Sequence, residues 1–97
     1  MLLSQPYRAP ERLTDLPNIN LQTASRLAKV GVNSVDDLLN GDPYQIFDVM
    51  LRKVDPGLKR QDLANLVGAY KGCHGNTVLG EAVREYKLRR PSHVWKE

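Results

Sequence analysis

The chain has 97 residues, and its 14 Lys and Arg against 11 Asp and Glu give a formal net charge of +3 at pH 7. This length suffices for one domain with one modest hydrophobic core, and nothing in the composition marks a second domain. Residues 1–57 carry a net charge of −1 and residues 58–97 carry +4. The basic character therefore lies in the second half of the chain.

Neither membrane insertion nor disulfide chemistry is indicated. No apolar run approaches membrane-spanning length, and the first ten residues lack the charged and apolar regions of a leader peptide. The single cysteine, Cys73, excludes an internal disulfide and a cysteine-cluster zinc site. We therefore expect a cytoplasmic protein with no cofactor and no small-molecule substrate.

The stretch from Leu16 to Leu38 predicts a helix, a short hairpin and two further helices. Pro17 prevents the preceding helix from continuing, and Asn18 and Asn20 flank the hairpin apex. Asn20 is suited to cap the next helix, because its side-chain oxygen can accept from an unpaired backbone N–H of the first turn.

The helix after the hairpin has an amphipathic pattern. Its apolar stripe is predicted to be buried and its polar stripe exposed. The apolar residues are Leu21, Ala24, Leu27 and Ala28, and the polar residues are Gln22, Ser25, Arg26 and Lys29. Gly31 is expected to end this helix in left-handed geometry.

Three further helices follow from start and stop signals. Ser34 and the pair Asp42-Pro43 are N-terminal signals, and Gly72 is a C-terminal one. Apolar residues at helical spacing continue to Pro91, and no alternating strand pattern of useful length is present. We expect an all-α, small single-domain helix-hairpin-helix bundle of five or six helices, with an N-terminal arm at 1–10, the domain at 11–90 and a tail at 91–97.

Two segments resemble the C-terminal domain of the TfoX/Sxy competence regulators. They are DLPNINLQTASRLAKVGVNSVDDL, which ends at Leu38, and LANLVGAYKGCH, which ends at His74. The segment Gly41–Met50 is similar to pathogenicity-locus relatives of the same hairpin superfamily. The resemblance implies a helix-hairpin-helix fold and a link to competence regulation or DNA handling.

Hairpins of this kind that bind DNA usually carry glycine on both sides of a hydrophobic residue, which lets phosphate approach the backbone. Here the apex is Asn18-Ile19-Asn20. Asparagine tolerates a positive φ, so the turn can form, but its side chain is expected to crowd the phosphate.

The preferred function is weak, sequence-independent DNA binding through backbone phosphates. The alternative is a protein-interaction module that keeps the hairpin only as scaffold. The basic helix end is as consistent with a solvated surface as with a nucleic-acid patch, because cations also favour a helix C-terminus. The candidate DNA-binding residues are Asn18, Ile19, Asn20, Gln22, Arg26, Lys29, Arg84, Lys87, Arg89 and Arg90.

No catalytic or metal-binding constellation is recognised, so we expect a protein that is not an enzyme. Cys73 and His74 are neighbours in sequence and lack an orienting third group, which favours a structural role. His93 has no partner at metal-ligand spacing. Trp95 either folds back onto the core or stays available to a partner.

Overall fold

The computed structural model describes residues 12–96, which form one 3-10 helix and five α-helices. They are η1 (Leu13–Asp15), α1 (Leu21–Ala28), α2 (Val35–Leu39), α3 (Pro43–Lys53), α4 (Arg60–Lys71) and α5 (Gly75–Arg89). No strand occurs in this part of the chain, which confirms the all-α prediction. In the described residues, the element before the hairpin is a single 3-10 turn. The predicted arm at 1–10 lies outside them, as does Glu97.

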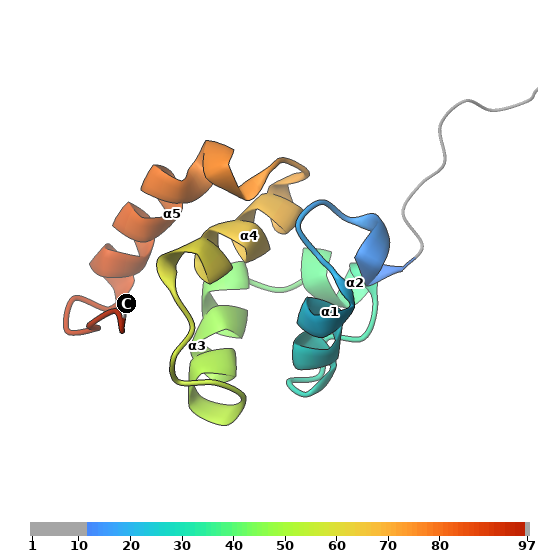
Figure 1. Cartoon of the computed structure of the whole chain (residues 1–97), viewed down its shortest axis with the longest axis horizontal. Coiled ribbons are helices and arrows are strands. Elements are labelled where there is room, and N and C mark those ends of the chain that lie inside the picture. The colour runs from blue at the N-terminus through green and yellow to red at the C-terminus, as the bar shows by residue number, and fades with distance from the viewer. Residues whose placement is uncertain (1–11, 97) are drawn as a thin grey trace, which may run out of the picture.

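In Figure 1, α5 and α4 lie above α3, and α1 and α2 lie to the right of α3. The most extensive packing joins α4 and α5, and α3 packs against α4. The short helices α1 and α2 lie at one end, and the C-terminal tail lies at the other (Figure 1). No helix within residues 12–96 is long and apolar enough to cross a membrane.

The predicted N-terminal caps are confirmed. The Oδ1 atom of Asn20 accepts from the Thr23 N–H at 2.8 Å, and the Oγ atom of Ser34 accepts from the Asp37 N–H at 3.1 Å. Asp42 accepts from the Tyr44 N–H at 2.9 Å, with a proline in the first helical position. Each cap supplies an acceptor to a first-turn N–H that has no partner within its helix.

Two glycines end helices as predicted. Gly31 has a φ of 88° and Gly72 a φ of 79°, both in the left-handed region. After each glycine the next N–H returns to a carbonyl five residues earlier: Val32 to Leu27 at 2.9 Å and Cys73 to Gly68 at 2.8 Å. This pattern is the Schellman motif, which pairs the last carbonyls of a helix.

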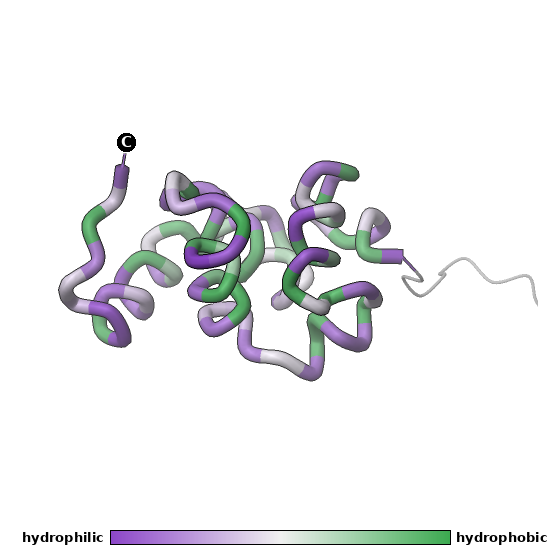
Figure 2. Tube along the Cα trace, turned by 90° about the horizontal axis from the view of Figure 1, so that it is seen from below, coloured by the Kyte–Doolittle hydropathy of each residue, from purple (hydrophilic) through white to green (hydrophobic). Residues whose placement is uncertain are grey.

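A single hydrophobic core joins all five α-helices. Its largest fully buried side chains are those of Leu27, Leu38, Phe47, Leu63 and Val67. Figure 2 shows apolar and polar residues alternating along the helical turns, as expected for helices that each bury one face.

The predicted apolar stripe of α1 is wrong in part. Leu27 is fully buried and Ala24 is partly buried against the core, but Leu21 is 81% exposed and Ala28 is also exposed. Because α1 is short and lies at the end of the molecule, it contacts the core through one narrow strip. Leu21 in the first turn and Ala28 in the last turn lie outside that contact.

Replacing Asn20 with Ala removes the cap of α1 and is expected to lower the free energy of unfolding by about 1 kcal/mol. Chemical denaturation measures the change. Gln22→Ala, at an exposed position two residues later, is the control and should shift stability by less than about 0.5 kcal/mol. Equal effects of the two substitutions would contradict the assigned cap.

Candidate nucleic-acid interface

The turn before α1, residues 16–20, is called the apex turn below, and Asn18 anchors it to the opposite part of the chain. Asn18 has a φ of 70°, the conformation expected for it. Its Nδ2 atom donates to the carbonyls of Cys73 at 2.9 Å and Asn65 at 3.3 Å, and its Oδ1 atom accepts from the Gly75 N–H at 3.1 Å. The Asn18 side chain thus faces the α4–α5 turn and does not crowd a phosphate outside.

Two glycines make this approach possible. A Cβ atom on Gly68 would lie 2.7 Å from the Asn18 Nδ2 atom, and one on Gly75 would lie 2.3 Å from the Asn65 Oδ1 atom. A Cβ atom on Gly68 would also lie 2.7 Å from the backbone carbonyl oxygen of Cys73, a distance that a Cβ atom does not tolerate. The start of α5 therefore packs directly against the backbone of α4, with the Asn18 amide beside this contact.

The other two apex residues differ in exposure. Ile19 is only 5% exposed and belongs to the core with Leu13 and Leu16, as expected for the apolar contacts of the turn. Its side chain therefore has a packing role. Asn20 is exposed, and its side-chain oxygen is engaged in the α1 cap.

The outer face of α1 presents one cation without an ion pair in the described residues. Gln22 and Lys29 are exposed as predicted. Arg26 is less exposed, because its guanidinium lies 3.7 Å from the carboxylate of Asp55 in the loop after α3. Of the predicted hairpin residues, Lys29 is thus the cation best placed to meet a phosphate.

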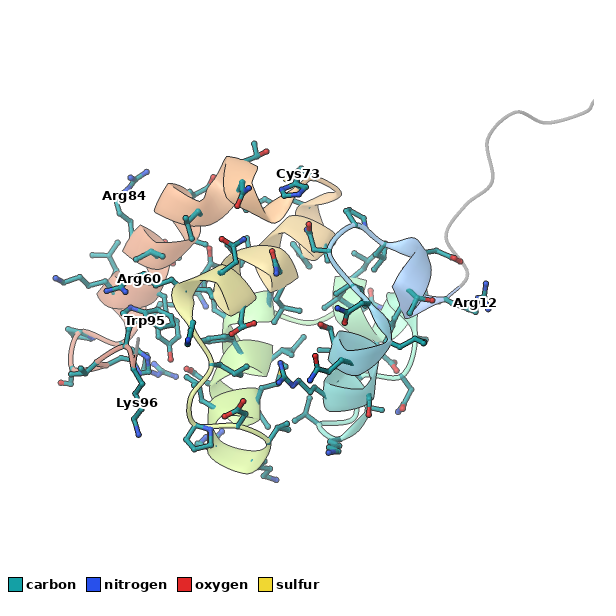
Figure 3. All side chains as sticks on the ribbon, viewed as in Figure 1. Arg12, Arg60, Cys73, Arg84, Trp95 and Lys96 are labelled. Carbon is teal, nitrogen blue, oxygen red and sulfur yellow. The ribbon has the colours of Figure 1, made fainter. Side chains whose placement is uncertain are left out.

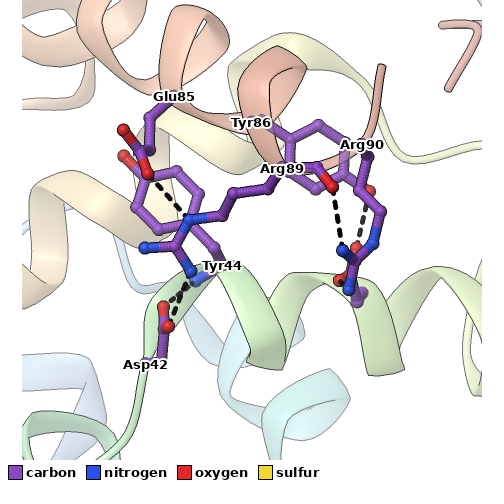
Figure 4. A network of polar contacts seen from close by, with 7 residues as sticks. Asp42, Tyr44, Glu85, Tyr86, Arg89 and Arg90 are labelled. Carbon is purple, nitrogen blue, oxygen red and sulfur yellow. Dashed lines mark hydrogen bonds and ion pairs between the residues drawn. The ribbon is translucent and has the colours of Figure 1, made fainter. Parts of the chain in front are cut away.

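The predicted basic cluster at the end of α5 contains two arginines already engaged in ion pairs (Figure 4). The Arg89 guanidinium donates to Asp42 at 2.7 Å and to Glu85 at 2.8 Å, and it lies over the Tyr44 ring at 4.5 Å. Burial raises the pKa of Asp42, but hydrogen bonds from Arg89 and the Tyr44 N–H outweigh this and hold the pKa below its usual value. These contacts join the end of α5 to the start of α3.

Arg90 makes a second connection between the same two helices. Its guanidinium lies 2.5 Å from Asp48, which also accepts from the Tyr86 hydroxyl at 2.7 Å (Figure 4). Burial, followed by the bond to Asp48, raises the pKa of Tyr86. Tyr86 therefore stays a neutral donor to Asp48.

The two remaining cations of the cluster lie on different surfaces. Arg84 and Lys87 are both exposed and make no ion pair within residues 12–96. Arg84 lines a cavity together with Glu81 and Glu85, whereas Lys87 lines another with Arg60 and Arg90. Figure 3 shows Arg84 projecting away from Arg60 and Trp95. The cluster predicted from sequence is thus divided between two surfaces.

The C-terminal tail folds back onto the core, which decides between the two alternatives for Trp95. The centroid of its ring lies 5.9 Å from that of Phe47, 5.5 Å from that of Tyr86 and 4.6 Å from that of His93. The Arg60 guanidinium lies 5.4 Å from the indole centroid, within the range of a cation–π contact. No local pattern in the sequence points to Arg60, because its partner Trp95 lies far along the chain.

Cys73 and His74 occupy the α4–α5 turn. His74 caps α5, with its Nδ1 atom accepting from the Asn76 N–H at 3.2 Å, and Cys73 is partly buried. Residues 12–96 contain no group of three or more His, Cys, Asp or Glu side chains that could hold a metal ion.

Comparison with known proteins identifies the family. The family model of the TfoX C-terminal domain matches residues 9–88, so the chain belongs to that family. A crystal structure of an uncharacterized protein from Listeria monocytogenes is similar, with a TM-score of 0.71 and 21% identity over 86% of this chain and 98% of that one. This likeness supports the fold. No curated protein gives a significant match.

Replacing Asn18 with Gly keeps a residue that favours positive φ and removes the three side-chain hydrogen bonds. We expect the free energy of unfolding to fall by about 2 kcal/mol, because part-buried partners on the α4–α5 turn lose their bonds. Asn33→Gly is the control, since it makes the same exchange at an exposed loop position. Denaturation curves that coincide for the two variants would contradict the role assigned to Asn18.

Proposed function

We propose that this protein is a non-enzymatic module that binds DNA weakly and without sequence preference, through contacts to backbone phosphates. Membership of the TfoX C-terminal domain family supports a place in competence regulation or DNA handling. A cytoplasmic location is part of the proposal. The chain has one cysteine and so cannot form an internal disulfide, which is consistent with a reducing compartment.

The proposal rests on the charged side chains, because in the described part of the chain most acidic groups are engaged while many cations are unpaired. Most acidic side chains in residues 12–96 are engaged, either as acceptors of backbone N–H groups, such as Asp37 and Asp42, or in pairs such as Glu81 with Lys71. Many cations in the same residues have no carboxylate partner there. Outside the cavity that Arg84 shares with Glu81 and Glu85, they are Lys29, Arg52, Lys53, Lys59, Lys87 and Lys96. A surface with excess cations attracts a phosphate backbone by releasing its counterions.

The first turn of α1 adds backbone donors to this surface. The Asn20 cap accepts from the Thr23 N–H. Leu21 and Gln22 are exposed residues at the positive end of the helix dipole, where N–H groups have no partner within the helix. The apex turn that precedes them is held by Asn18. A phosphate at this end would meet a preformed turn, whereas Lys29 follows the last residue of α1, at the other end of the helix.

A non-enzymatic role fits the side chains that could carry chemistry. His74 uses its Nδ1 atom to cap α5, and the Tyr86 hydroxyl donates to Asp48. Among residues 12–96, neither group is arranged with a nucleophile and an orienting third residue, as acid–base or covalent catalysis requires.

A protein partner is the second candidate, with the hairpin serving as scaffold. The observation that favours it is the exposure of two leucines, Leu21 on α1 at 81% and Leu88 on α5 at 78%. They lie on separate elements, and single exposed leucines are common on soluble proteins. The charge distribution favours DNA.

A salt series tests the proposal. Fluorescence anisotropy with labelled duplexes of unrelated sequence should give equal dissociation constants, on the order of 10⁻⁴–10⁻⁶ M, that weaken steadily as salt increases. Absence of binding at low ionic strength would reject DNA as the ligand and favour a protein partner. Strong discrimination between duplexes would contradict binding through phosphates.

A further inference from the structure

The C-terminal tail completes a cavity of about 390 Å³ at the opposite end of the molecule from α1. It is called the tail cavity here. Arg60 from the start of α4, Lys87 and Arg90 from α5, and His93 and Trp95 from the tail contribute to its lining. None of the described residues that line it is acidic. The cavity with Arg84, on the other side of α5, includes Glu81 and Glu85.

We propose that the tail cavity is a second site for the phosphodiester backbone of DNA, separate from the apex turn and α1. The inference rests on the proposed function, namely that the protein binds DNA phosphates, and it adds the surface that does so. Arg90, His93 and Trp95 follow the residues matched by the family model, which end at 88. The site is therefore built partly from this chain's own tail.

Two cations give the cavity its preference for an anion, and a buried imidazole nitrogen lies beside them. Lys87 is exposed and makes no ion pair within residues 12–96, so its ammonium is available to a ligand. The Arg90 side chain stays 53% exposed while paired with Asp48, which leaves room for a further acceptor. The Nε2 atom of His93 is buried and has no hydrogen-bond partner in the described residues. A phosphate oxygen can accept from the exposed Lys87 and Arg90 side chains, whereas the His93 Nε2 atom is closed off from solvent.

Trp95 acts as a positioning residue. Its contacts with Phe47 and Tyr86 hold the tail against the core, and its ring lies beneath the Arg60 guanidinium. Arg60 is also the first residue of α4, a helix of 12 residues whose positive dipole end lies at this side. The cations of the cavity are thus carried by packed elements and need little reordering when DNA binds.

Lys87 and Arg84 form a matched pair for the test, because both are exposed on α5 and neither has an ion pair in the described chain. In full-length protein, Lys87→Glu should lower DNA affinity in anisotropy titrations and reduce the log–log salt slope by about 0.9, the loss of one duplex phosphate contact. Arg84→Glu makes the same charge change and should retain the slope. Equal losses for both variants would overturn the inference, and equal melting temperatures check that both fold.

The position of binding can be read directly, because Trp95 is the only tryptophan in the chain. Saturating unlabelled duplex should change its emission in parallel with the anisotropy. Unchanged emission on a rising anisotropy curve would overturn the inference and leave the proposed function standing. No binding by either readout would reject both. An equal change with inorganic phosphate at the same phosphate concentration would overturn the assignment to a DNA backbone.

Discussion

The fold depends on one side-chain amide that joins segments far apart in sequence. Asn18 bonds to the carbonyls of Asn65 and Cys73 and to the N–H of Gly75, so the apex turn is attached to the α4–α5 turn. A buried or part-buried backbone group needs a partner, and the Asn18 side chain supplies three at once. The position of α1 follows from this contact, because the chain enters α1 directly from the apex turn.

The same contact determines whether the asparagine at the apex obstructs a phosphate. Glycine in this position would allow phosphate to approach, whereas asparagine is expected to obstruct it. The structure turns the Asn18 side chain inward, so the outer side of the turn stays open. The protein thus gains a link between its two halves at a position where glycine could only provide a turn.

Much of the fold could be predicted because the relevant signals are local. The caps at Asn20, Ser34 and Asp42 and the glycine ends at Gly31 and Gly72 depend on residues a few positions away. Each therefore appears in the sequence as a short pattern. The family resemblance added the order of the helices.

The candidate site was less predictable because charges and faces depend on tertiary partners. Arg26 pairs with Asp55 and Arg89 with Asp42, and neither pair has a signal at helical spacing. Periodicity predicted a buried Leu21, yet no element within residues 12–96 covers the first turn of α1. The tail cavity brings together α4, α5 and the residues after Pro91, so only the folded chain defines it.

The central structural claim is that Asn18 holds the apex turn to the α4–α5 turn. Amide hydrogen exchange at Gly75 measures this most directly, because the N–H of that residue donates to the Asn18 side chain. We expect slow exchange of the Gly75 amide in the native protein and rapid exchange in Asn18→Gly, with protection retained in the middle of α4. Equal exchange rates at Gly75 in the two proteins would contradict it.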